Sequence, residues 1–206
     1  TVVNYEYLFY WRFKLDGTID YEIRLSGELS TNLLSERESE PTHGTIVAPG
    51  VNAQIHQHMF CARLDMAVDG DENTVSEIDV VPEESELGNA FVAKETVLKN
   101  ESEAVRTCDA TKARTWKVSN PAKLNPISKK PVAYKLVPFT RGPVHPVLMT
   151  SDKSSVSSKG QFAKANLWVT PRDPKERFPA GEYVVQQQEP DGLPKWIKAK
   201  RNIENT

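Results

Sequence analysis

Two histidines, His56 and His58, stand two positions apart in the largely apolar segment "VNAQIHQHMFCARLDM" (51–66), and the chain has four histidines in 206 residues. In an extended strand, the side chains of residues i and i+2 project from the same face. Two imidazoles that emerge side by side from an apolar surface can supply two nitrogen ligands to one metal ion. The alternative is a pair of structural, hydrogen-bonded histidines at a sheet edge.

The residues that follow the pair exclude two kinds of metal site. A cupin-type site needs a carboxylate four or five residues after the second histidine, where Ala62 and Arg63 stand. A metallohydrolase of the H-x-H-x-D type needs an aspartate where Phe60 stands. A three-histidine site remains, and the candidate third ligands within the chain, His43 and His145, both lie in segments rich in proline and glycine.

The two cysteines of the chain indicate neither a disulfide framework nor a zinc site. Cys61 and Cys108 are too few for a set of disulfides or for a zinc site made of paired thiolates. Cys61 lies in the apolar segment and is most simply a small buried hydrophobic side chain. A single bridge between the two cysteines is left open.

The overall composition narrows the class of protein. The net charge is −2 with both signs well mixed, so no basic stripe points to nucleic acid as a partner. No apolar run approaches the roughly 20 residues of a membrane span, and there is no signal-peptide pattern. The chain opens "TVVNYEY", without Met and already in strand-like alternation. We therefore expect it to be a fragment or a processed piece.

The first thirty residues predict a β-hairpin that carries an aromatic stripe. Aromatic and apolar residues occupy the odd positions from 5 to 15 and most odd positions from 19 to 29, with polar residues between them. Asp16-Gly17 is a strong hairpin signal, because glycine tolerates the positive φ of a type I′ turn. Two matched amphipathic strands imply an antiparallel sheet with one wet face.

The rest of the chain predicts further short strands. Besides 51–66, the candidate strands are 89–99, 132–137, 165–170 and 182–187. Segments 35–50 and 150–160 are expected to be loops, and 100–118 is ambiguous, a short helix being one option. Fourteen prolines and many short strands favour an all-β sandwich over a helical architecture.

A tyrosine motif near the start of the chain offers an explanation for the histidine pair. Residues 1–7 match T-x-x-N-Y-[DE]-Y, and this pattern resembles the copper amine oxidases, in which the first tyrosine of the motif is oxidised in place to topaquinone. The family also carries H-x-H about fifty residues later as two of three copper ligands. Here His56 follows Tyr5 by 51 residues.

Further stretches resemble the same family, and the resemblance is closest to its fungal and yeast members. These stretches are "VNAQIHQH" leading to "RLDM", "VDGDEN" (68–73), "NPISKKPVAYKL" (125–136), "LWVT" (167–170) and "PAGEYVVQ" (179–186). The resemblance therefore covers the whole chain. It implies that residues 1–206 form a single partial domain, the central part of a large antiparallel β-sandwich (supersandwich) catalytic domain.

The resemblance implies oxidative deamination of a primary amine by O2, which yields an aldehyde, ammonia and H2O2. Copper(II) favours the phenolate of Tyr5, as metals do for bound oxygen acids, and the ring becomes the quinone that forms a Schiff base with the amine. In this scheme His56 and His58 are copper ligands, and Asn4 and Tyr7 position the cofactor.

Parts of the family pattern are missing from this sequence. The catalytic aspartate lies upstream of the tyrosine motif and the third copper histidine lies downstream, so we expect the isolated piece to be inactive. A second metal site of the R-L-D-x-D kind is matched at Asp65 and Met66, but Ala67 replaces the second aspartate. With one carboxylate missing, the affinity of this site for calcium should be low, and the alternative for Asp65 is a strand-end or turn residue.

The partners and the location follow from the same resemblance. It implies a homodimer for the parent protein and a cytoplasmic or peroxisomal location, whereas the composition predicts no nucleic acid or membrane partner. The alternative of a different class is a non-catalytic β-sandwich binding module whose histidines are structural.

Overall fold

The computed structural model of this chain describes residues 1–35, 41–138, 154–187, 189 and 191–204. It is built mostly from antiparallel β-sheets with a few short helices, which confirms the all-β fold. The chain divides into two compact units, residues 1–58 and residues 59–206. None of the helices in the described ranges has the length and apolar character that crossing a membrane requires.

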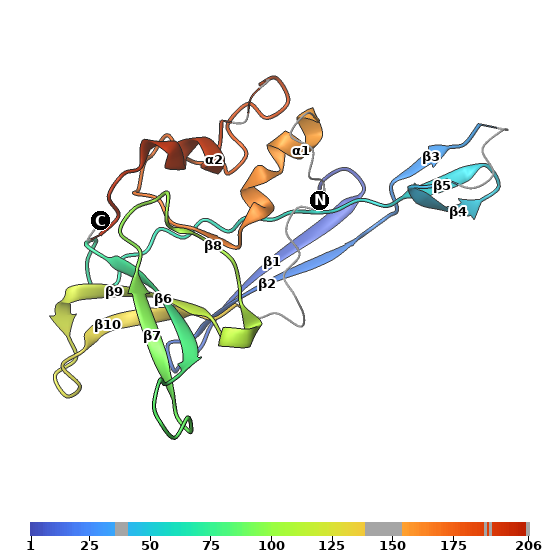
Figure 1. Cartoon of the computed structure of the whole chain (residues 1–206). Helices are drawn as coiled ribbons and strands as arrows, with labels where there is room; N and C mark the ends of the chain where they lie inside the picture. The colour runs from blue at the N-terminus through green and yellow to red at the C-terminus, as the bar shows by residue number, and fades with distance from the viewer. Residues whose placement is uncertain (36–40, 139–153, 188, 190, 205–206) are drawn as a thin grey trace. The chain divides into compact units, whose positions relative to one another are not determined.

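Unit 1 begins with the predicted hairpin, formed by β1 (Tyr5–Phe13) and β2 (Ile19–Gly27) in continuous antiparallel register (Figure 1). The turn is not of type I′, because that turn needs positive φ at both central residues, and here Gly17 has φ 84° while Asp16 does not. The Gly17 N–H donates to the Lys14 carbonyl at 3.1 Å, and the Lys14 N–H donates to the Thr18 carbonyl at 2.9 Å. Glycine thus supplies the single left-handed residue that this longer loop needs.

A second sheet of unit 1 has the strand order β3-β5-β4 (Figure 1). Its strands are β3 (Thr31–Leu33), β5 (Val51–Gln54) and β4 (Gly44–Ala48). The expectation of a loop over 35–50 is wrong for β4, and the strand expected over 51–66 ends at Gln54. Within the described residues, no strand pairs with residues 55–67. These residues are therefore not a β-strand, because a strand requires a hydrogen-bonded neighbour in a sheet.

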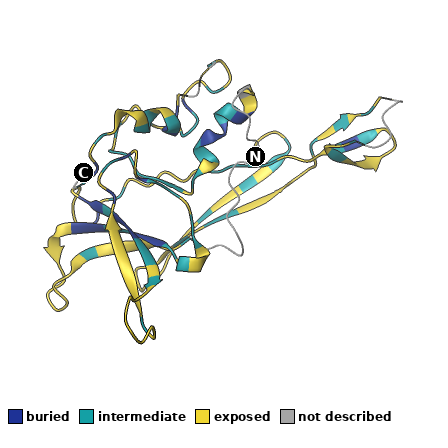
Figure 2. Ribbon diagram, in the orientation of Figure 1, coloured by how far each residue is buried: buried dark blue, intermediate teal, exposed yellow. Residues whose placement is uncertain are grey.

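Unit 2 contains a four-stranded sheet with the order β10-β9-β6-β7. Its strands are β10 (Pro131–Leu136), β9 (Thr115–Leu124), β6 (Thr74–Pro82) and β7 (Phe91–Val97). β7 and β10 confirm two of the predicted strands, whereas the sequence did not predict the two central ones. Figure 2 shows buried residues gathered on β6 and β9, and several of them are polar: Ser76, Glu77, Ser119 and Asn120.

Glu77 ties the centre of this sheet to β8 (Val105–Arg106). Its side chain is buried and accepts hydrogen bonds from Arg106 Nε at 2.8 Å and Trp116 Nε1 at 3.1 Å, with Arg114 forming a second ion pair at 3.3 Å. Burial by itself raises the pKa of Glu77, but the hydrogen bonds from Arg106 and Trp116 outweigh it and leave the pKa lowered. The carboxylate is therefore a paired structural charge.

The remainder of unit 2 consists of short elements. They are β11 (Leu167–Trp168), which pairs with β8, the α-helices α1 (Ser155–Lys159) and α2 (Leu193–Trp196), and the 3-10 helices η1 (Ala110–Lys112), η2 (Gln161–Lys164) and η3 (Ile197–Ala199). Leu98, Ala104 and Ile203 form a small buried cluster.

Three sequence expectations for unit 2 need correction. The strand expected over 165–170 is limited to two residues, and the strand expected over 182–187 is a turn in which Gln186 and Gln187 donate their N–H groups to the Tyr183 carbonyl. The loop expected over 150–160 includes α1, and its residues 150–153 lie outside the described ranges. The ambiguous 100–118 segment contains both β8 and η1.

The burial of individual residues also differs from expectation. Both cysteines are free, so no bridge joins them, and Cys61 is exposed rather than buried. The aromatic stripe of the hairpin is exposed as well, with Phe13 76% and Trp11 46% accessible. The antiparallel pairing of the two hairpin strands is as predicted, but the described chain leaves the apolar face of the hairpin largely uncovered.

Candidate functional site

Tyr5 and the two histidines lie together in unit 1. The Tyr5 Oη atom is 2.6 Å from Nε2 of His56. The ring centroids of Tyr5 and His58 are 4.6 Å apart, and those of the two histidines are 4.7 Å apart. The structure thus brings the rings of Tyr5, His56 and His58 into one site. His56 and His58 do not lie in a regular strand.

Strand pairing brings these distant residues together. β2 leads into β3, β3 pairs with β5, and the Gln54 N–H at the end of β5 donates to the Ser30 carbonyl at 3.0 Å. Tyr5 is paired with Gly27 at the open end of the hairpin. A Cβ atom on Gly27, whose φ is 126°, would lie 2.3 Å from the Asn4 carbonyl oxygen, so this close approach requires glycine.

The orientation of His56 is set by the backbone. Its Nδ1 atom lies 2.9 Å from the Gln54 carbonyl oxygen, and because a carbonyl can only accept, Nδ1 carries the hydrogen. In the neutral ring Nε2 then keeps its lone pair, and the Tyr5 hydroxyl donates to it. Metal-binding histidines are held in this way, with one ring nitrogen bonded to a carbonyl and the other available to the metal.

Tyr7 and His58 form a second tyrosine–histidine contact two residues further on, through the other ring nitrogen. Tyr7 Oη is 2.8 Å from Nδ1 of His58, and the Tyr5 and Tyr7 rings are stacked, 5.8 Å apart and 8° from parallel. Since Nδ1 of His58 is engaged by Tyr7, Nε2 is the nitrogen that His58 can offer to a metal ion.

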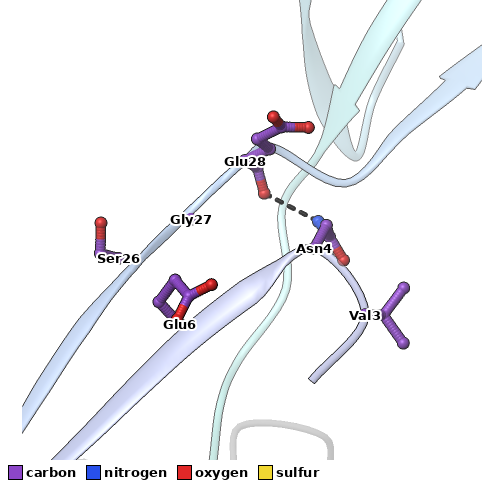
Figure 3. A pocket seen from close by; sticks show the side chains of 6 residues that line it. All are labelled: Val3, Asn4, Glu6, Ser26, Gly27 and Glu28. Carbon is purple, nitrogen blue, oxygen red and sulfur yellow. Dashed lines mark hydrogen bonds between the residues drawn. The ribbon is translucent and has the colours of Figure 1, made fainter. Parts of the chain in front are cut away.

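The Asn4 side chain lies at the edge of the site. Its Nδ2 atom donates to the Glu28 carbonyl at 2.7 Å (Figure 3) and to Ser30 Oγ at 3.4 Å. Ser30 Oγ is in turn 2.6 Å from Tyr5 Oη. Ser30 was not identified from the sequence. The hairpin register was a usable signal, because it pairs Tyr5 with Gly27 and so brings the residues just after Gly27 close to Tyr5.

Asn4 also lines an open pocket of about 440 Å³ (Figure 3). It is lined by Val3, Asn4, Glu6, Ser26, Gly27 and Glu28. Glu6 alternates with Tyr5 along β1 and points to the opposite face of the strand, where its carboxylate accepts a hydrogen bond from the Thr1 hydroxyl at 2.9 Å. Tyr5, Ser30, His56 and His58 do not line this pocket.

Other residues considered from the sequence are placed elsewhere. His43 gives its carbonyl to the Ile55 N–H at 3.0 Å, and His145 lies outside the described residues. Asp65 forms an ion pair with Arg172 at 2.5 Å, so its carboxylate is already engaged. Over the described ranges, no group of three or more His, Cys, Asp or Glu side chains, including any around Asp65 and Met66, is arranged to hold a metal ion.

The donor set of the site fits copper. Two imidazole nitrogens and a phenolic oxygen suit Cu(II) better than they suit a hard cation such as calcium, which prefers carboxylate and carbonyl oxygens. The hydrogen bond from Nδ1 of His56 to a backbone carbonyl fixes the tautomer in which Nε2 can bind a metal. His56 and His58 can thus supply two ligands, with Tyr5 beside them.

Comparison with known proteins gives a consistent assignment. The family model described as copper amine oxidase, enzyme domain, matches residues 1–206. The chain is 42% identical to a histamine oxidase of Arthrobacter globiformis, covering 99% of the chain and 29% of that protein. It is also 42% identical to copper amine oxidase 1 of Schizosaccharomyces pombe, covering 100% of the chain and 30% of that protein. The chain therefore spans about 30% of the length of these relatives.

A solved structure supports the same assignment. The crystal structure of a copper-containing benzylamine oxidase from Hansenula polymorpha matches with a TM-score of 0.85 and 37% sequence identity. The match covers 100% of this chain and 32% of that structure. Its coverage extends over both compact units.

Proposed function

This chain belongs to the copper amine oxidase family, for which copper and topaquinone are typical, and we propose that the full-length protein carrying it oxidises primary amines. The products would be an aldehyde, ammonia and H2O2, with O2 as the oxidant. The observation that carries this proposal is the 2.6 Å contact between the Tyr5 hydroxyl and a histidine oriented for metal binding. The family's homodimer is proposed for the full-length protein as well.

We propose that Tyr5 is the residue converted to topaquinone and that His56 and His58 are two of the copper ligands. Copper bound there would favour the phenolate and bring O2 chemistry to the ring, and the quinone would accept the electron pair of the amine. Conversion of the Tyr5 ring adds two oxygen atoms and removes two hydrogens. The balanced step consumes two O2: two of the four oxygen atoms enter the ring, and the other two leave with the two hydrogens as one H2O2.

The other residues of the site hold these three in place. The Gln54 carbonyl keeps the proton of His56 on Nδ1, and Tyr7 engages Nδ1 of His58. Asn4 supports the position of Tyr5 through its hydrogen bonds to the chain after β2. We propose that a third copper ligand and the base that accepts the amine's α-proton come from the rest of the full-length protein, as the family pattern implies.

The test of this proposal uses the full-length protein prepared without copper. After addition of Cu(II) in air, mass spectrometry of the Tyr5 peptide should show a gain of two oxygens and a loss of two hydrogens, and a primary amine should then yield H2O2. Protein loaded with Zn(II) is the control and should keep an unmodified tyrosine. A copper-loaded protein with unmodified Tyr5 would support the binding-module alternative instead.

Tyr7→Phe is expected to weaken copper binding about 10- to 100-fold, because it removes the hydroxyl that orients the His58 ring. A competition titration against a copper chelator measures this affinity. Tyr10→Phe is the matched control, since Tyr10 lies on the same strand with its ring under the guanidinium of Arg24, 4.8 Å away. Equal copper affinity in the Tyr7 variant and the wild type would rule out this role of Tyr7.

A further inference from the structure

We propose that Ser30 is a positioning residue for the conversion of Tyr5: its hydroxyl donates a hydrogen bond to the phenolic oxygen and holds the ring beside His56 and His58. The two oxygens are 2.6 Å apart. This role of Ser30 rests on the proposed function, since it concerns the formation of the quinone at Tyr5.

The direction of this hydrogen bond follows from its neighbours. His56 uses its Nδ1 hydrogen on the Gln54 carbonyl, so Nε2 of the neutral ring accepts from Tyr5. A phenol has one hydrogen to donate, and Tyr5 gives it to His56. The Ser30 hydroxyl must therefore be the donor in its bond with Tyr5 Oη.

The bond from Ser30 is the one that can persist during the reaction. A metal ion bound at His56 Nε2 would occupy the lone pair that accepts from Tyr5, so the hydrogen bond between Tyr5 and His56 would be lost. The hydrogen bond from the Ser30 hydroxyl does not use that lone pair, so it would still hold the phenolic oxygen in place. The Tyr5 ring would then keep its position beside the two histidines.

Ser30 is held in place from several sides. It is half-buried between β2 and β3, its carbonyl accepts from the Gln54 N–H at 3.0 Å, and its hydroxyl oxygen accepts from Asn4 Nδ2 at 3.4 Å. Asn4 is itself fixed by the Glu28 carbonyl. Asn4, Ser30, Tyr5 and His56 thus form a series in which each side chain donates to the next, and such series reinforce one another.

The test measures quinone formation in the full-length protein carrying Ser30→Ala, Ser30→Thr or Ser26→Ala. Each copper-free protein is mixed with Cu(II) in air, and the quinone absorbance and the mass of the Tyr5 peptide are followed with time. Ser30→Ala should form the quinone up to about 10-fold more slowly, as expected for the loss of one hydrogen bond that orients the ring. Ser30→Thr keeps the hydroxyl and should restore most of the rate.

Control measurements separate this role from a structural one. Copper stoichiometry, the electron paramagnetic resonance spectrum of the bound copper and the thermal unfolding midpoint should be unchanged in Ser30→Ala. Ser26→Ala alters an exposed serine that lines the pocket beside Glu6 and should behave like the wild type. A Ser30→Ala protein that forms the quinone at the wild-type rate would overturn this inference, whereas a wild-type protein that forms none would overturn the proposed function.

Discussion

Tyr5→Phe is expected to abolish amine oxidation by the full-length protein, with activity lower than that of the wild type by at least about a thousandfold. Phenylalanine keeps a ring that can stack on Tyr7, but it lacks the oxygen that lies 2.6 Å from both His56 and Ser30. Without a phenol no quinone can form at this position. Release of H2O2 from a primary amine measures the activity.

The copper content of the same variant shows which role has been lost. His56 and His58 are unchanged, so Tyr5→Phe should retain copper near the wild-type stoichiometry. Tyr134→Phe, at an exposed position on β10, is the matched control and should retain both copper and activity. Activity in the Phe variant would mean that another group carries the redox chemistry.

The hairpin could be predicted from sequence because its signals are local. Alternating residues define both strands, and the Asp16-Gly17 pair marks the turn between them. The register of the hairpin then returns the chain to the neighbourhood of Tyr5. Ser30 could not be recognised from its residue type, because serine is common and its importance depends on a partner 25 residues away.

The central strands of unit 2 could not be predicted because most of their buried positions are polar. Glu77 is 3% exposed and its charge is neutralised by arginines from other segments, so β6 lacks the alternation of apolar and polar residues that indicates a strand. β9 contains Pro121, which argues locally against a strand. In both cases pairing and ion-pair formation override the local pattern.

The prediction that His56 and His58 lie close together is correct, although the predicted strand is wrong at these two residues. The prediction placed His56 and His58 on one face of a strand, but β5 ends at Gln54. The rings still lie 4.7 Å apart, because the Gln54 carbonyl accepts a hydrogen bond from His56 and the Tyr7 hydroxyl contacts His58. Hydrogen bonds of the histidine rings, and not strand pairing, hold these two residues in place.

His56→Ala is expected to weaken copper binding more than about 100-fold and to stop quinone formation at Tyr5. Loss of a metal ligand costs more than loss of the groups that orient it, which is itself worth about 10- to 100-fold. Copper analysis and the mass of the Tyr5 peptide measure the two effects in the full-length protein. His43→Ala is the matched control, since His43 takes part in unit 1 through its backbone carbonyl.

His56→Gln separates a metal ligand from a structural histidine. Glutamine offers an amide oxygen that can accept from the Tyr5 hydroxyl, so it can replace the hydrogen bond that His56 makes, but it is a poor ligand for copper. If His56 serves to hold the fold, the Gln variant should resemble the wild type in unfolding temperature and in copper content. If His56 binds copper, the Gln variant should keep the wild-type unfolding temperature of the copper-free protein and still fail to take up the metal.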